Sequence, residues 1–411
     1  MRTATSIGIA VFSLVSGAGW AAGTASAADF DSFLVPGTRA PVVIAERPFA
    51  LTGLLPDGSL NPKFGSGGAV RAPFPGVADL RAEAAATQVD GKIVVSGYAS
   101  KPTAAGTYPR HVAVARFLSS GRPDRGFGDG GAVITRQGGR GSEIAALPGG
   151  GLLVAGMTGS QKPMLLRLRP DGSPDRRFGR AGVAVVRLRR GPHSEPLEGA
   201  VTDLVPRKGG GIVLSIYGAF GNGRPRSSIL VRYGPQGRLD RHFGSGDMVA
   251  LDLPGIGPGV YSLAAQEGRL IARAATSTPP FYVALIGLLG NGRLDRSYGR
   301  GGVALGPPAP NGFDVGFALG PEGSAAIAVP GSNSYPPTFA LAQITARDAS
   351  RGGSGGEITP QIRGMGPYSV VIRPGGDILT LSFDVDPPHE PLVARIRFDG
   401  DSLGIWPAPG Q

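Results

Sequence analysis

Short apolar runs, each preceded by a glycine turn, recur along the chain and predict β-strands. One copy of this unit reads QVDGKIVVSG at 88–97, and another reads ALPGGGLLVAG at 146–156. The run Ile93-Val94-Val95 is continuously apolar, which is typical of a strand covered on both faces. The turn glycines of successive copies are 53 to 60 residues apart and stand at Gly37, Gly91, Gly150, Gly210, Gly268, Gly323 and Gly376.

Other runs alternate strictly between two faces. Met164, Leu166 and Leu168 point one way, whereas Leu165 and Arg167 point the other. Period-2 alternation between Asp-Gly, Asn-Gly and Pro-Gly turns predicts antiparallel hairpins. No 3.6-residue apolar period is present, so helical arrays are disfavoured.

A second recurring element is a strand and a turn followed by D-x-x-F-G. The copy at 53–70 has Asn61 in place of Asp, and those near 344–358 and 395–406 are decayed or truncated. The intact copies, in the last of which Tyr replaces Phe, are Asp124, Phe127 and Gly128; Asp175, Phe178 and Gly179; Asp240, Phe243 and Gly244; and Asp295, Tyr298 and Gly299.

Each repeat therefore contains four strand-like runs. In the second repeat they lie near 80–89, 92–98, 111–118 and 131–136. A four-stranded sheet cannot bury both faces alone, and closing a row of such sheets into a ring leaves only short protected edges. We therefore expect an all-β, seven-bladed β-propeller of four-stranded antiparallel blades. Six blades remain the alternative, should residues 28–45 not form strands.

We place the whole propeller in a single domain at 28–411. Its seven repeats lie near residues 32–79, 80–140, 141–197, 198–259, 260–313, 314–365 and 366–408.

The run DGKIVV at 90–95 and the recurring D-x-x-F-G resemble the delta-60 repeat family of bacterial proteins, over residues 50–305 most clearly. That resemblance implies a β-propeller domain of unknown function and an exported protein. It implies no catalytic residue, because the members of the family share no established activity.

The N-terminus predicts export. Residues 1–27 combine Arg2, the apolar stretch IGIAVFSLV at 7–15 and an A-x-A site ending at Ala27, which is the pattern of a cleaved signal peptide. The apolar stretch is too short to span a bilayer, which needs about 20 apolar residues. We expect a secreted or cell-envelope protein with no membrane span after removal of the signal.

Composition narrows the chemistry. Cysteine is absent, which excludes thiol nucleophiles and thiolate metal sites. The formal net charge is +11, and it comes almost entirely from arginine. This excess is explained either by codon usage or by attraction to an anionic polymer. The arginines form no basic run, so we expect no nucleic-acid partner.

The recurring residues allow two interpretations each. The motif aspartates either accept hydrogen bonds within their own turns, which we favour, or form a calcium ring. The motif aromatics either plug the contact between blades, which we favour, or form a glycan platform. Four arginines stand five residues before a turn glycine: Arg116, Arg167, Arg232 and Arg395. They either pair with an aspartate or a carbonyl between blades, which we favour, or form an anion-binding ring.

One irregular stretch, 187–199, is a candidate anion-contacting loop, the alternative being a tolerated insertion. Its basic residues are Arg187, Arg189, Arg190 and His193.

No motif indicates catalysis. The four histidines are scattered without metal-ligand spacing, and no nucleophile elbow or phosphate loop is present. We therefore predict no catalytic residue, metal site or cofactor. The expected function is a non-catalytic binding or interaction scaffold for an extracellular or envelope partner. The alternative is a propeller-type hydrolase or lyase acting on extracellular glycan.

Overall fold

The computed structural model describes the chain from residue 32 to residue 308 with short gaps, and from there on its strands alone. The predicted signal peptide at 1–27 lies outside the described residues. The described ranges are 32–38, 40–45, 49–55, 60–104, 106–187, 197–220, 227–245, 248–266, 268–308, 316–319, 325–330, 338–344, 362–363, 365–372, 378–383, 391–396 and 404–406.

Every regular element of these ranges is a β-strand, and neighbouring strands run antiparallel, which confirms the all-β prediction. The first sheet comprises β1 (Ser32–Leu34), β2 (Val42–Ala45), β3 (Ala50–Gly53) and β4 (Ala69–Arg71). The second comprises β5 (Asp79–Thr87), β6 (Ile93–Ser100), β7 (Arg110–Phe117), β8 (Ala132–Ala146), β9 (Leu152–Thr158), β10 (Pro163–Leu168) and β11 (Val183–Val185).

Four further sheets follow in sequence order. They comprise β12 (Leu197–Pro206), β13 (Ile212–Phe220), β14 (Ser227–Tyr233) and β15 (Met248–Ala250); then β16 (Ser262–Gln266), β17 (Arg269–Ala275), β18 (Tyr282–Leu288) and β19 (Val303–Pro308); then β20 (Gly316–Leu319), β21 (Ala325–Pro330), β22 (Thr338–Ile344) and β23 (Ile362–Arg363); and last β24 (Met365–Ile372), β25 (Ile378–Phe383), β26 (Pro391–Ile396) and β27 (Gly404–Trp406).

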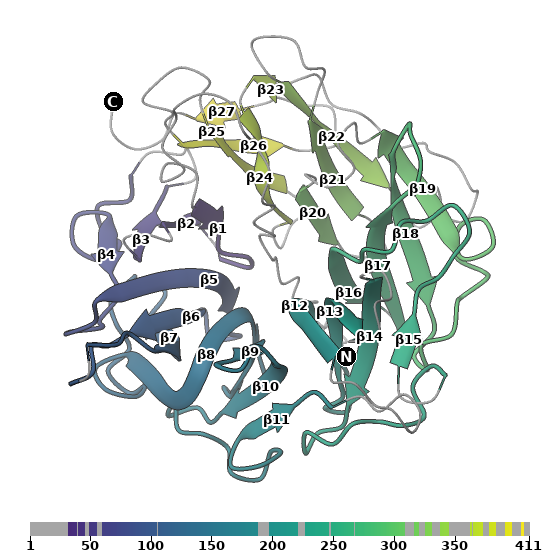
Figure 1. Ribbon diagram of the computed structural model, residues 1–411. Coiled ribbons are helices and arrows are strands. Elements are labelled where there is room, and N and C mark those ends of the chain that lie inside the picture. Colours follow the sequence, from purple (N-terminus) through teal and green to yellow (C-terminus); the bar gives the residue numbers. More distant parts are fainter. Residues whose placement is uncertain are drawn as a thin grey trace, which may run out of the picture.

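Strand β8 departs from the predicted pattern, because the expected boundary between repeats at 140/141 falls inside it. Its partner changes from β7 to β9 at Gly138-Gly139: Gly138 pairs with His111, and Gly139 pairs with Thr158. Gly139 has a φ of 125°, which glycine adopts without steric cost. The chain therefore bends here without leaving the sheet, and Figure 1 shows β8 as one long curved strand.

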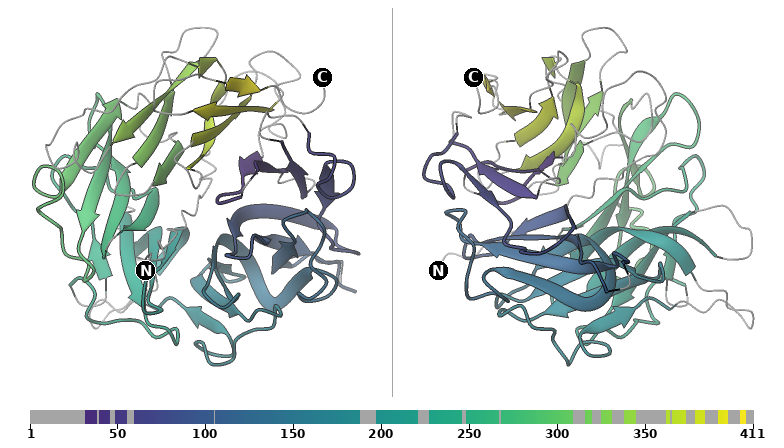
Figure 2. Two further views of the ribbon diagram at one scale, coloured as in Figure 1. Left: turned by 180° about the vertical axis from the view of Figure 1, so that it is seen from behind. Right: turned by 60° about the vertical axis from the view of Figure 1, so that its left-hand side comes forward.

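The sheets are arranged around a common axis, with their first strands innermost (Figures 1 and 2). Strand β1 contacts β24 and β25, so the first and last sheets are neighbours. The described chain contains no helix of the length and hydropathy needed to cross a membrane.

The core consists of apolar layers between neighbouring sheets rather than one central cluster. In β6, Ile93 and Val95 pack in a cluster with β2 and β3, whereas Val94 packs in a cluster with β9 and β10. In β10, Leu166 faces the second repeat and Leu165 faces the fourth. The two faces of one strand thus belong to two different layers, which is what the alternating pattern predicts.

The aromatic residue of each D-x-x-F-G motif lies in these layers. The exposed fraction of the side chain is 0% for Phe127, Phe178 and Phe243, 3% for Phe64 and 7% for Tyr298. Burial of this degree supports the interpretation as a plug and not as an exposed glycan platform.

Phe178 shows what the plug contacts. A Cβ added to Gly237, the glycine of the corresponding turn in the next repeat, would lie 2.9 Å from the Phe178 ring. The backbone N–H of Gly179 also donates to the carbonyl oxygen of Gln236 at 2.8 Å. The Phe-Gly pair of one repeat therefore sits directly on the turn of the next, and no other residue than glycine fits at 237.

The glycine that closes each motif has the same left-handed backbone in all four intact copies. The φ angles are 55° at Gly128, 53° at Gly179, 69° at Gly244 and 54° at Gly299. The N–H groups of Gly128 and Gly244 donate to the next repeat as that of Gly179 does. The turn that would correspond for Gly299 falls within residues 345–358, which lie outside the described residues. Its contact with the next repeat therefore stays a prediction.

A role for Gly299 within its own loop is nevertheless defined. A Cβ added to Gly299 would collide with the carbonyl oxygen of Val303, the first residue of β19. The same collision would occur between Gly179 and Val183 in the third repeat. Gly299 is thus a structural glycine that lets the motif loop turn back onto its own last strand.

We expect Phe178→Ala to lower the free energy of unfolding by about 3–5 kcal/mol, since it removes a fully buried ring from a contact that cannot collapse. Tyr108→Ala is the control, because Tyr108 is 60% exposed and its loss should change stability by less than about 0.5 kcal/mol. Urea unfolding monitored by fluorescence measures both. A midpoint for Phe178→Ala within error of the unsubstituted protein would contradict the plug.

Candidate functional site

The aspartate that opens each motif holds its own loop. Its Oδ1 accepts a hydrogen bond from the backbone N–H two residues later, at 2.9–3.1 Å in all four intact copies. Its Oδ2 forms an ion pair of 2.6–3.2 Å with an arginine of the same repeat. The pairs are Asp124–Arg116, Asp175–Arg167, Asp240–Arg232 and Asp295–Arg269.

These contacts fix the charge state of the motif. Burial raises the pKa of the Asp124 carboxyl, but the Gly126 N–H and the charges of Arg116 and Lys92 outweigh it, so that the pKa lies below its ordinary value. Each motif carboxylate already faces a cation, which opposes a shared calcium ring. Among the described residues, no three His, Asp or Glu side chains come together as a metal site would require.

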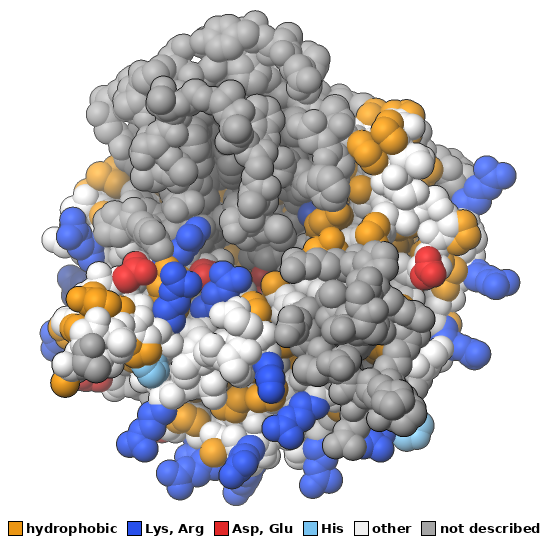
Figure 3. Space-filling model, viewed as in Figure 1, with side chains coloured by type: hydrophobic (Ala, Val, Ile, Leu, Met, Phe, Trp, Pro, Cys, Tyr) orange, Lys and Arg blue, Asp and Glu red, His pale blue; other side chains and the backbone are white. Residues whose placement is uncertain are grey.

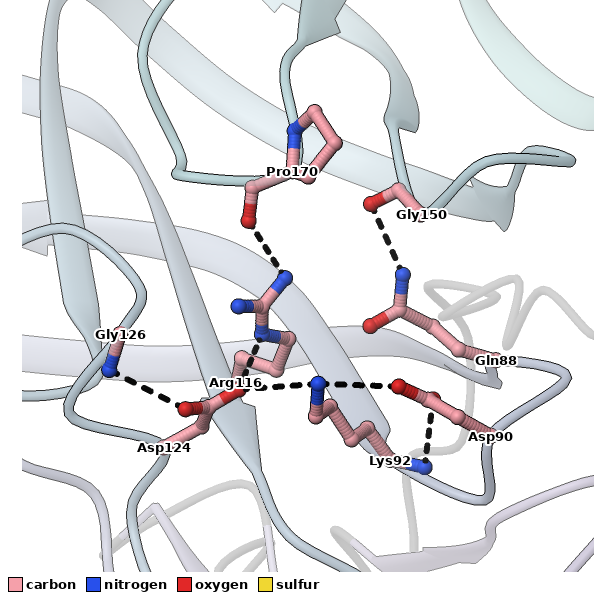
Figure 4. Close-up of polar contacts among 8 residues, drawn as sticks. All are labelled: Gln88, Asp90, Lys92, Arg116, Asp124, Gly126, Gly150 and Pro170. Carbon is pink, nitrogen blue, oxygen red and sulfur yellow. Dashed lines mark hydrogen bonds and ion pairs between the residues drawn. The ribbon is translucent and has the colours of Figure 1, made fainter.

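The paired arginines also reach across to the next repeat. Arg116 donates from Nη1 to the carbonyl oxygen of Pro170 at 2.6 Å (Figure 4). Its guanidinium also lies 4.6 Å from the Phe127 ring centroid. Arg167 donates in the same way to Pro235 at 2.8 Å, and Arg232 donates to Gly290. These three side chains join repeats and do not form an anion-binding ring. The side chain of Arg395 lies outside the described residues.

A second set of arginines in the same loops is exposed. We call it the arginine band, because it follows the motif loops through four consecutive repeats. Figure 3 shows Lys and Arg side chains along much of the rim of the molecule. The band consists of Arg122, Arg125, Arg176, Arg177, Arg180, Arg238, Arg241, Arg293, Arg296 and Arg300.

The band carries an excess of positive charge. No acidic side chain among the described residues forms an ion pair with any of its guanidinium groups. The motif aspartates cannot neutralise it, since they are already paired with arginines of the strands and turns. Asp129 and Asp171 are exposed in these loops and offset only part of the charge.

A hollow of about 420 Å³ lies beside the band in the third repeat. Arg169, Asp175 and Arg177 line it. The candidate loop at 187–199 is less informative: Arg187 is exposed, whereas Arg189, Arg190 and His193 lie outside the described residues.

Acidic residues also occur on the innermost strands, where the sequence analysis nominated none. Glu83 Oε1 on β5 lies 3.4 Å from Arg140 Nη1 on β8. Burial raises the pKa of the Glu83 carboxyl, although the charges of Arg140, Arg81 and Arg110 lower it. Glu143 on β8 and Asp203 on β12 are fully buried. Each stands seven or eight residues before a turn glycine within an apolar run, a signal that could have identified them.

Asp203 ties two repeats together. Its Oδ2 accepts hydrogen bonds from the backbone N–H of Leu263 and from Ser262 Oγ on β16, and its Oδ1 accepts from the N–H of Leu204. Burial is the dominant influence and raises the pKa of Asp203 to about 7, although these donors and Arg273 lower it. With no exposed surface, this carboxyl serves the contact between β12 and β16 and cannot reach a substrate.

Comparisons with known proteins agree with the fold and assign no activity. Residues 88–127 match a family model described as a domain of unknown function (DUF5122) beta-propeller. This match supports a propeller repeat family of unknown function. No curated protein matches the chain.

Several solved structures resemble it. A polysaccharide lyase, PL25 ulvan lyase, is 11% identical with a TM-score of 0.44, covering 90% of this chain and 87% of that one. The polysaccharide lyase Uly1 is 9% identical with a TM-score of 0.45, covering 84% of each chain. Drosophila Plexin A in complex with Semaphorin 1b is 8% identical with a TM-score of 0.40, covering 96% and 88%. Likenesses at this level carry no argument about what the chain does.

We expect stability to fall as the pH rises from about 4 to about 7, because the Asp203 carboxyl has a pKa of about 7 when folded and an ordinary value of 3.8 when unfolded. Below that window both states are protonated, and above it the folded state holds a buried charge, which costs at most about 4 kcal/mol. Asp203→Asn should remove this part of the slope, since its side chain stays neutral. Urea unfolding at pH 4, 5.5, 7 and 8 measures it, and identical pH profiles for both proteins would rule the interpretation out.

Proposed function

We propose that the chain is an exported, non-catalytic β-propeller scaffold that binds an anionic partner outside the cell or in the cell envelope. The observation that carries this proposal is the arginine band: exposed guanidinium groups in four consecutive repeats that form no ion pair with the described acidic side chains, four of them at equivalent positions. Guanidinium groups recognise carboxylate, sulfate and phosphate oxygens, and a regular array suits a partner with repeated negative charges.

The proposed architecture is a ring of seven blades within residues 28–411. The strand orders support it, because counting β8 in two groups divides the strands into seven groups of four. Residues 32–34 and 42–45 form strands of their own sheet, which disfavours the six-bladed alternative. The recurring D-x-x-F-G loops support assignment of the repeats to the delta-60 type.

The proposed location rests on the sequence of residues 1–27, which has the composition of a cleaved signal peptide. An exported protein meets the charged polymers of the envelope and the extracellular space. The charge of the band therefore gives the proposed location and the proposed partner a common rationale.

The alternative is a hydrolase or lyase that acts on extracellular glycan, and one observation favours it. Glu83 has a raised pKa and lies next to Arg140 on the innermost strands, and pairs of this kind occur in active sites. Glu83→Gln distinguishes the two proposals, since an enzyme would lose polysaccharide cleavage and a scaffold would bind its partner unchanged.

Replacement of Arg125, Arg176, Arg241 and Arg296 by alanine should weaken binding to polygalacturonate on the order of 10-fold or more at low salt, and should flatten the dependence of affinity on salt concentration. These arginines occupy the same position in four repeats. Titration of the purified protein at 20 mM and 500 mM NaCl measures both effects.

The matched control removes four exposed cations elsewhere: Arg71, Lys101, Arg136 and Lys162. If both quadruple variants lost affinity equally, net charge and not the band would be responsible. If the unsubstituted protein bound no polyanion at low salt, the proposed function would be wrong.

A further inference from the structure

The hollow in the third repeat combines two cations with one acceptor. Arg169 follows β10, and Arg177 lies in the motif loop; both side chains are exposed. The third lining residue, Asp175, is already engaged, because its Oδ2 lies 3.2 Å from Arg167 Nε and its Oδ1 accepts from the Arg177 backbone N–H at 3.1 Å. With the charge of Asp175 compensated by Arg167, the hollow has a net positive charge from Arg169 and Arg177.

Two other repeats show that these two arginines are not needed for the fold. The position of Arg169 is occupied by Leu118 in the second repeat and by Leu289 in the fifth. The position of Arg177 is occupied by Gly126 and Ser297 in the same two repeats. All of these loops make the same turn hydrogen bond to the motif aspartate. Both arginines therefore add charge to a loop that forms without them.

We propose that this hollow binds one acidic sugar residue of the anionic partner, with Arg169 and Arg177 on its carboxylate or sulfate group. This assignment rests on the proposed function and names the point of the band at which a single unit of the polymer is recognised. Each guanidinium group offers a fork of N–H donors that matches a carboxylate or sulfate group, and both side chains line the same hollow. The remaining lone pairs of Asp175 accept hydrogen bonds from sugar hydroxyls, which a bare phosphate lacks.

Size and surroundings agree with a sugar. A volume of about 420 Å³ lies in the range of small-molecule sites. A site for single-stranded nucleic acid typically presents an aromatic side chain for stacking of the bases. Among the described residues the exposed large hydrophobic side chains include one aromatic, Tyr108, in the loop between β6 and β7 at the opposite end of the sheet from the motif loops.

The test uses the full chain with tetragalacturonate as the probe and galactotetraose as its neutral counterpart. The variant R169L/R177S carries residues that the same positions hold in the fifth repeat, so the loop should fold. The control R122S/R293S likewise removes two exposed arginines, both from the band, at the position where the third repeat has Ser173. Melting curves check that both variants fold like the unsubstituted protein.

We expect the unsubstituted protein and R122S/R293S to bind tetragalacturonate with affinities within about 2-fold of each other, and R169L/R177S to bind it about 10-fold more weakly or not at all. Galactotetraose should not bind. Equal affinities of the two variants for the probe would overturn the assignment of the hollow. A (dT)₄ oligonucleotide that bound more tightly than tetragalacturonate and lost that affinity in R169L/R177S would also overturn it, in favour of phosphate.

Long polygalacturonate separates this failure from failure of the proposed function. If the unsubstituted protein bound the long polymer and both variants bound it equally more weakly, the proposed role of the band would stand and the proposed role of the hollow would be wrong. If the unsubstituted protein did not bind the long polymer at low salt, the proposed function of the band would be wrong, and so would the proposed site in the hollow.

Discussion

The contact between a motif loop and the turn of the next repeat is the interaction on which the rest of the structure depends. The Phe178 ring lies against Gly237, the Gly179 N–H donates to the Gln236 carbonyl, and Arg167 donates to the Pro235 carbonyl. Three consecutive residues of one turn thus receive three different contacts from the preceding repeat. Because the contact recurs, each sheet is placed by its neighbour, and the sheets follow one another around the axis.

This contact also determines which charges remain available. The motif aspartates and the arginines of the third strands neutralise each other while they bind backbone groups, so neither set offers a net charge to a ligand. The arginines next to those aspartates along the chain have no such partner in the described part of the molecule. The motif loops therefore carry exposed positive charge, and a hollow lined by Arg169, Asp175 and Arg177 lies among them.

Much of the fold follows from local pattern. Continuous apolar character at Ile93-Val94-Val95 and alternation at Met164–Leu168 predict strands buried on both faces, and the layers confirm them. The continuity of β8 does not follow from sequence, because Gly138-Gly139 resembles a turn until its two partner strands are known. Nor does the separation of paired from exposed arginines, since the partner of Arg116 includes a carbonyl in another repeat. The hollow could not be predicted from the sequence for the same reason, because its lining depends on which arginines are paired and which are exposed.

Amide hydrogen exchange at the motif glycines tests the contact between repeats most directly. The N–H groups of Gly128, Gly179 and Gly244 donate to the next repeat beside a buried phenylalanine, and each should exchange only when that contact opens. We expect protection close to that of the strand amides of β6 and β9, and fast exchange at Gly130, which is exposed in the same loop as Gly128. If the N–H groups of Gly128, Gly179 and Gly244 exchanged as fast as that of Gly130, the motif loops would not hold neighbouring repeats together.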